Sequence, residues 1–389
     1  MRLLTYSFNE PTKIICGLGS VAELKNEIAK LRGKSVMVVC DSGVANAGLA
    51  DIVTGIISEM SQVKCCVYDR VIPNPYDLTM DEGYEFAMKN EVDLIVGIGG
   101  GSSLDSAKGI ALLLANGGKM REYLMEGRVP EKKIAPTVCI PTTAGTGSEV
   151  TRTVVATDSV TKFKDGFKFA DILFADVAIL DASLMEKLPA SVLAACGMDA
   201  LTHAIEGYIT WQSNPMTDAF NIQAIKLIGE NLRKAYAQPQ NLEAKENLLL
   251  ASTMTGVAFD QSGLGLAHCM GHPMGGLFNV PHGVACAMAL PVTMEYNVIA
   301  VPEKLCEVAK ALGKDVQGLE LREAARMAVF AVKELLLDLN LPMTLREINI
   351  QEHDIKALAE DAMKFPGMRK ASPREASYKD VEKLFIELL

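Results

Sequence analysis

The first half of the chain alternates short apolar, β-branched segments with segments of helical composition. Segment 34–43, KSVMVVCDSG, passes from a charged residue into an apolar run and stops at a polar turn. Segments 92–112 and 133–151 repeat this plan, and each carries a glycine-containing loop after its apolar run. Uniformly apolar strands separated by helices are typical of a parallel sheet with helices on both faces. We therefore predict an open α/β sheet here.

The second half lacks such strand-like runs. Segments 189–210, 246–260 and 321–340 space their apolar residues as helices do, so we predict an all-helical second domain. A chain of 389 residues is also too long for one ordinary core. We place the domains at 1–184 and 185–389, because the proline at 189 can start a helix shortly after that boundary.

The net charge and the positions of the cysteines limit the classes of function that this protein can have. The formal net charge is −10 and no basic run is present, which argues against binding to nucleic acid or to an anionic membrane. The nine cysteines lie in apolar segments without paired spacing, as expected for reduced core residues. Neither a secretion signal nor a membrane-spanning apolar run is visible, so we expect a cytoplasmic protein.

Two loops at predicted strand ends have the composition of phosphate-binding loops. The loop 97–105, GIGGGSSLD, lets the backbone approach a diphosphate and leads into a helix whose first amides are free. The loop 141–149, PTTAGTGSE, adds hydroxyl groups from Thr142 and Thr146. Loops at the carboxyl ends of parallel strands form nucleotide-binding crevices, although both could be ordinary turns.

Asp41 ends the first of these predicted strands. Its carboxylate could accept hydrogen bonds from a ribose diol and would repel a 2′-phosphate, which favours NAD over NADP. The alternative role for an aspartate at this place is turn formation.

Three of the five histidines lie in one apolar stretch, 265–287, with no acidic or basic residue among them. A buried neutral imidazole needs partners for its ring nitrogens, and a metal ion would satisfy all three rings together. Asp199 and His203 stand four residues apart and would share one face of a helix. One carboxylate with imidazoles suits Fe²⁺ or Zn²⁺. The alternatives are hydrogen-bonded core histidines or a purely structural metal site.

Together these motifs resemble those of the iron-containing (group III) alcohol dehydrogenase family. The resemblance covers nearly the whole chain, from PTKIICGLGSVAEL through GGGSSLDSAK, PTTAGTGSEVT and GMDALTHAIEGY to GLAHCMGHPMGG and PHG. It implies a dehydroquinate synthase-like architecture: an N-terminal α/β dinucleotide-binding domain, an all-α C-terminal metal-binding domain, and a divalent metal in the cleft between them. It also implies a homodimer or a larger homo-oligomer.

The resemblance assigns roles residue by residue. The family's metal ligands fall on Asp199, His203, His268 and His282. His272 falls on a histidine near the nicotinamide and the substrate, where it could relay a proton; its alternative is a hydrogen-bonded core histidine. We predict cofactor contacts at Asp41, Asn74, Gly99, Gly100, Gly101, Ser102, Asp105, Thr142, Thr143, Thr146, Thr151 and Lys164.

The sequence departs from the family pattern where the substrate pocket is expected. Thr153 stands where many relatives have phenylalanine and would widen or polarise the pocket, and Phe259 is a further pocket candidate. Near the carboxyl terminus, Phe365 replaces an acid, and Arg369 and Lys370 add two cations. We expect a solvated loop there; the alternative is that Arg369 or Lys370 binds an anionic aldehyde with a sulfonate, carboxylate or phosphonate tail.

The first functional hypothesis is a metal-dependent NAD(H) alcohol dehydrogenase or aldehyde reductase. Hydride would pass between the nicotinamide and a short-chain aldehyde or alcohol polarised by Fe²⁺, with Zn²⁺ as the other candidate ion. The alternatives are a reductase of a small anionic aldehyde, a lyase that uses NAD and a metal as dehydroquinate synthase does, a glycerol dehydrogenase-like zinc enzyme, and a non-enzymatic metal or NAD sensor.

Overall fold

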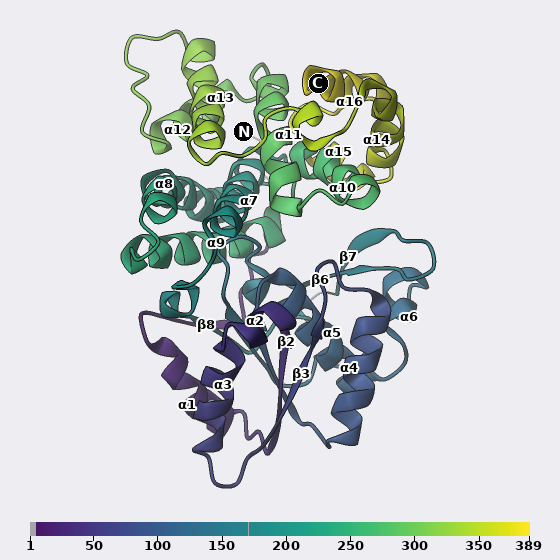
Figure 1. The fold of residues 1–389 in the computed structure, drawn as a ribbon. Helices are drawn as coiled ribbons and strands as arrows, with labels where there is room; N and C mark the ends of the chain where they lie inside the picture. Colours follow the sequence, from purple (N-terminus) through teal and green to yellow (C-terminus); the bar gives the residue numbers. More distant parts are fainter. Residues whose placement is uncertain (1–4, 170) are drawn as a thin grey trace. The chain divides into compact units, whose positions relative to one another are not determined.

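The computed structural model describes residues 5–169 and 171–389 (Figure 1). The chain divides between Leu188 and Pro189, close to the boundary that the sequence placed at Leu184. The described residues before Glu10, which the sequence assigned to the α/β domain, group with the helical unit instead. They do so because the Phe8 ring stacks on Phe220 at 5.9 Å, and the Gln261 side chain donates a hydrogen bond to the Asn9 carbonyl at 2.9 Å.

A parallel sheet forms the centre of the α/β unit, and within the described residues its strand order is β1-β8-β5-β4-β2-β3. The strands are β1 (Lys13–Cys16), β2 (Ser35–Asp41), β3 (Lys64–Val71), β4 (Leu94–Gly99), β5 (Thr137–Pro141) and β8 (Val177–Leu180). Strands β4, β5 and β8 are buried at every position, which explains why their sequences are apolar apart from Thr137 at the start of β5.

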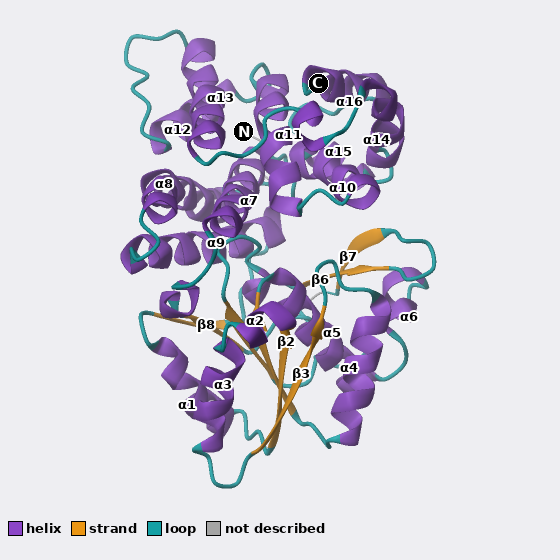
Figure 2. Ribbon diagram, in the orientation of Figure 1, coloured by secondary structure: helices purple, strands orange, loops and turns teal. Residues whose placement is uncertain are grey.

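Helices cover both faces of this sheet, as predicted (Figure 2). Apolar side chains of α1 (Leu24–Lys30) and α3 (Leu49–Ser58) pack on one face. Those of α4 (Asp77–Lys89) and α5 (Gly101–Asn116) pack on the other. The short helices α2 (Ser42–Asn46) and α6 (Met120–Met125) complete the unit.

A small antiparallel pair, β6 (Thr153–Thr157) and β7 (Lys164–Lys168), forms a separate sheet that the sequence did not predict. Val154 and Ala156 of β6 are buried against the cluster that contains α4 and α5. The pair therefore extends the core on that face of the sheet without joining the sheet itself.

The second unit is helical throughout its described residues, which confirms the predicted fold class. Its helices are α7 (Ala190–Ile209), α8 (Pro215–Ala237), α9 (Leu242–Ser262), α10 (Leu266–Phe278), α11 (His282–Asn297), α12 (Pro302–Ala311), α13 (Leu321–Asp338), α14 (Ile355–Ala362), α15 (Pro366–Ala371) and α16 (Tyr378–Glu387). Helix α7 is buried along most of its length because it packs against α8, α9 and α11. None of the helices described here combines the length and the hydrophobicity that crossing a membrane requires.

Candidate functional site

The glycine loop after β4 closely approaches the loop after β5. Gly99 has a φ of +142°, a conformation that favours glycine, and Gly100 then precedes α5. A Cβ atom built on Gly101 would lie 2.7 Å from the Thr146 side chain, and one built on Gly100 would lie 3.3 Å from Thr143 Oγ1. The two predicted phosphate-binding loops therefore meet at the amino end of α5, where backbone amides can bind an anion.

A buried polar network holds the second loop. The Asp105 carboxylate accepts hydrogen bonds from Ser148 Oγ at 2.5 Å and from the Val155 amide at 3.2 Å. The fully buried Lys108 donates to the carbonyl groups of Ser148, Thr151 and Thr153 at 2.8, 3.1 and 2.6 Å. Lys108 was not predicted from the sequence. A lysine inside the apolar run AKGIAL nevertheless indicates a buried ammonium group, which needs hydrogen-bond acceptors around it.

Other predicted cofactor residues lie at strand ends and connections. Asp41 accepts hydrogen bonds from the Val44 amide and from Ser103 Oγ, both at 3.0 Å, and so caps α2 and ties it to α5. Lys164 Nζ donates to Asn74 Oδ1 at 2.8 Å. Ser102 lies in the first turn of α5, and the amide of the buried Thr142 donates to the Gly99 carbonyl at 2.9 Å.

Residues predicted as metal ligands come together from three helices of the second unit. Asp199 lies on α7, His268 on α10, and His282 is the first residue of α11. The Asp199 Oδ1 atom is 3.9 Å from His268 Nε2 and 3.7 Å from His282 Nε2. Three donor atoms thus face one another at a spacing suited to ligands of one ion.

The side chain of His203, the fourth predicted ligand, contacts this set of residues through the face of its ring. Its ring stacks on His268 with a centroid distance of 4.6 Å and on Phe259 at 4.5 Å. The fourth member of the cluster whose donor atoms all lie within 4.8 Å of one another is Cys286. Sequence reasoning did not choose Cys286, although it follows His282 by four residues on one helix, the same spacing that linked Asp199 to His203.

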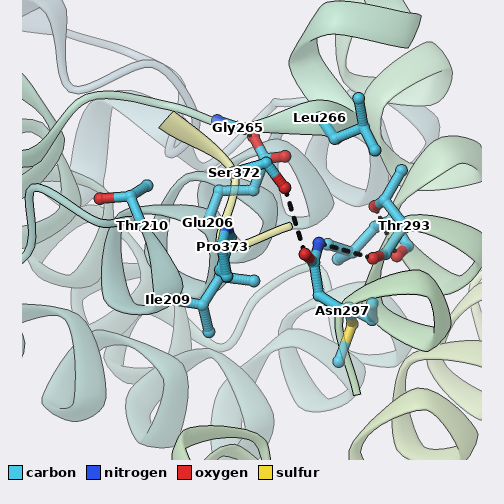
Figure 3. Close-up of a pocket in the computed structure, with 11 residues that line it drawn as sticks. Glu206, Ile209, Thr210, Gly265, Leu266, Thr293, Asn297, Ser372 and Pro373 are labelled. Carbon is cyan, nitrogen blue, oxygen red and sulfur yellow. Dashed lines mark hydrogen bonds between the residues drawn. The ribbon is translucent and has the colours of Figure 1, made fainter. Parts of the chain in front are cut away.

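Glu206 positions His268 and was also missed from the sequence. His268 Nδ1 donates to Glu206 Oε2 at 2.6 Å, and the amides of Gly265 and Ala267 donate to the same carboxylate at 3.0 and 2.5 Å. Figure 3 shows Glu206 beside Gly265 in a small cavity. Glu206 therefore caps the amino end of α10, where Gly265 has no side chain, and fixes the orientation of the His268 ring.

The surroundings of His268 suit a cation. Its Nε2 atom is buried and has no hydrogen-bond partner among the described residues. Burial acts against its protonated form, but Cys286 and Glu206 outweigh burial and raise the pKa of His268 well above its ordinary value. A buried place that stabilises positive charge beside converging oxygen and nitrogen donors fits a divalent metal ion.

His272 lies at the edge of the cluster and remains partly exposed. Its ring meets Phe365 edge-on at 4.7 Å and His282 at 5.5 Å. Phe259 and Phe365 thus bring two aromatic rings into contact with the imidazoles of the site.

The carboxyl-terminal segment is not the solvated loop that the sequence predicted. Phe365 is buried at 8% exposure, and Pro366 starts the helix α15 directly after it. The Arg369 guanidinium donates to Glu375 Oε1 at 3.0 Å and to the Ala376 carbonyl at 2.8 Å, whereas Lys370 is exposed.

Comparison with known proteins covers both units. The model of the iron-containing alcohol dehydrogenase family matches residues 11–182, and the model of the C-terminal region of the Fe-containing alcohol dehydrogenase family matches residues 193–389. The chain is 37% identical to NAD-dependent methanol dehydrogenase of Bacillus methanolicus, over 98% of this chain and 99% of that protein. It is 38% identical to 1,3-propanediol dehydrogenase of Citrobacter freundii, over 98% of each. A solved structure of a 1,3-propanediol oxidoreductase superposes with a TM-score of 0.95 at 35% identity, over 99% of this chain and 100% of that one.

Proposed function

Because the chain belongs to the iron-containing alcohol dehydrogenase family, we propose that it interconverts a neutral short-chain alcohol and its aldehyde with NAD(H). The family match confirms the predicted family, the assignment to oxidoreductases, and NAD and iron as cofactors. The observation that carries the proposal is the convergence of Asp199 Oδ1, His268 Nε2 and His282 Nε2. These three residues would hold the ion, with His203 as the fourth predicted ligand.

Each group then has a chemical task. A divalent ion bound by these residues would act as a Lewis acid and polarise the substrate oxygen. Glu206 keeps the His268 ring oriented, and the glycine loop at Gly99 to Gly101 binds the cofactor diphosphate. We assign to His272 the transfer of a proton between the substrate oxygen and water, because it is partly exposed whereas His268 is fully buried.

The aromatic contacts favour a neutral substrate over an anionic one. Phe259 and Phe365 pack against His203 and His272, so apolar rings adjoin the imidazoles. The Arg369 guanidinium already interacts with the Glu375 carboxylate, which offsets its charge. A short alkyl aldehyde matches this environment better than one with a sulfonate or carboxylate tail.

The function is tested by reconstitution. The chain is purified without oxygen, its metal content is measured, and NADH oxidation is followed with a panel of neutral and anionic aldehydes. We expect activity with neutral aldehydes that chelation removes and Fe²⁺ restores. Fully metallated protein that binds NADH but turns over none of the aldehydes would overturn the proposal in favour of a lyase or a sensor.

Replacing Arg369 by alanine separates the two substrate classes. We expect KM for propanal and KM for sulfoacetaldehyde to change by the same factor, within about twofold. The reason is that the Arg369 guanidinium donates its hydrogen bonds to Glu375 and to the Ala376 carbonyl. Steady-state kinetics with both aldehydes measures this, and Lys370→Ala is the matched control. A rise in KM confined to sulfoacetaldehyde would instead establish the anionic substrate.

Gly101→Ala tests the cofactor loop. The new Cβ would crowd Thr146 and push the two loops apart, at a cost of about 1–3 kcal/mol, so we expect roughly ten- to hundredfold weaker NADH binding. Fluorescence titration with NADH measures the Kd. The control is Gly55→Ala in α3, where a Cβ meets no atom within 4 Å. An unchanged Kd for Gly101→Ala would remove this loop from the cofactor site.

A further inference from the structure

The Asp41 carboxylate is held at both of its oxygen atoms, by two different helices. Oδ1 accepts a hydrogen bond from the Val44 amide at 3.0 Å, and Oδ2 accepts one from Ser103 Oγ at 3.0 Å. Val44 lies in α2, directly after Asp41, whereas Ser103 lies in the first turn of α5. An ionised carboxylate offers about four acceptor positions, so about two remain for a ligand. The Asp41 side chain is only partly buried, which leaves it accessible to one.

The sheet brings Ser103 to Asp41 although 62 residues separate them in the sequence. Asp41 ends β2 and Gly99 ends β4, and these two strands are parallel neighbours. Helix α5 begins at Gly101, so its first turn passes beside the end of β2. Ser103 is fully buried there. A buried hydroxyl group needs a hydrogen-bond acceptor, and Asp41 supplies it.

Two glycines leave room for this contact. A Cβ atom built on Gly99 would lie 2.6 Å from Ser103 Oγ, and one built on Gly43 would lie 2.9 Å from Asp41 Oδ1. A side chain at either position would displace the hydroxyl group or the carboxylate. The backbone around Asp41 is therefore shaped to keep its carboxylate in one orientation.

We propose that Ser103 is a positioning residue that sets the preference of this protein for NAD(H) over NADP(H). The Val44 amide holds only one oxygen, and the terminal torsion of an aspartate is soft. The second hydrogen bond, from Ser103, stops the carboxylate from turning and keeps its charge and its remaining acceptor positions in one place. This inference rests on the proposed function, since it concerns the cofactor of that reaction.

A fixed carboxylate distinguishes the two cofactors by their adenosine ribose. The ribose hydroxyl groups of NAD(H) can donate hydrogen bonds to the remaining acceptor positions of Asp41, whereas the 2′-phosphate of NADP(H) would meet a negative charge. A carboxylate that is free to turn loses part of the first contact and avoids part of the second. Ser103 thus acts on the choice of cofactor through Asp41, without touching the cofactor itself.

Ser103→Ala tests the proposal by binding, without turnover. The Kd values of NADH and NADPH are measured on the full chain by fluorescence titration. We expect NADH to bind about three- to tenfold more weakly, as expected for the loss of one hydrogen bond, and NADPH to bind as well as before or better. The ratio of Kd for NADPH to Kd for NADH should therefore fall at least about threefold.

The matched control is Ser106→Ala. Ser106 lies on the same helix and is equally buried, but its Oγ atom has no hydrogen-bond partner among the residues that the structure describes. The same hydroxyl group is removed in the control, so both Kd values should stay as in the unchanged protein.

A double-mutant cycle with Asp41→Ala separates positioning from packing. We expect Asp41→Ala to lower the Kd ratio itself, and Ser103→Ala to have no further effect on the ratio in that background, because the residue through which it acts is gone. A ratio that stays within about twofold in Ser103→Ala or in Asp41→Ala, or an equal effect of Ser103→Ala in both backgrounds, would overturn the role of Ser103 and leave the proposed function standing. Failure of the unchanged protein to bind NADH would overturn both.

Discussion

His268→Ala is expected to remove the bound metal and to lower kcat/KM by about three orders of magnitude or more. His268 is fully buried, and its Nε2 atom lies 3.9 Å from Asp199 Oδ1 among the donors of the site. The Lewis acid is worth several kcal/mol of transition-state stabilisation, and each 1.36 kcal/mol corresponds to about tenfold in rate. Metal analysis and NADH oxidation under anaerobic conditions measure the two effects.

The control for this change is His353→Ala. His353 has a side chain that is 81% exposed and lies in the same helical unit, so its loss should leave metal content and rate unchanged. NADH binding should persist in both variants, because the cofactor loops belong to the α/β unit. Stoichiometric metal and near-normal turnover in His268→Ala would contradict the assigned site.

Glu206→Gln is expected to weaken metal binding by about ten- to hundredfold, the usual cost of removing a group that orients a ligand. The amide cannot match the carboxylate as acceptor for the His268 ring and for the Gly265 and Ala267 amides. Glu206→Ala should in addition lower the free energy of unfolding of the metal-free protein by roughly 1–3 kcal/mol, because a buried ring N–H and a helix end lose their partner. Chelator competition and thermal unfolding measure these two quantities.

Glu243→Gln provides the comparison. Glu243 is an exposed glutamate in the first turn of α9, so the same chemical change is made away from the imidazoles. Its metal affinity should equal that of the unchanged protein. An affinity in Glu206→Gln that also stays unchanged would show that the ring of His268 is oriented without Glu206.

The α/β fold could be predicted because buried parallel strands contain continuous apolar runs, and β2, β4 and β5 contain such runs. The pair β6 and β7 could not be predicted in the same way. Its strands are five residues each, KDGFK is mostly polar, and the buried residues of β6 pack in the cluster that contains α4 and α5.

The spacing of residues along helix α7 explains why Asp199 and His203 could be predicted from the sequence. It also shows how Glu206 could have been predicted. Asp199 and His203 were paired by a four-residue spacing, and Glu206 follows at a seven-residue spacing from Asp199 on the same face of α7. Extending that pattern by one turn would have identified Glu206. The meeting of His268 with Asp199 could not be derived locally, because it depends on how α10 packs beside α7.

The donors of the site come from α7, α10 and α11, and the contact between Glu206 and His268 spans 62 residues of sequence. The nascent chain thus has no preformed place for an ion until α11 has been synthesised and packed. The protein therefore binds its metal ion late in biogenesis. The helical unit folds first and then takes up an ion from the free ions available at that time.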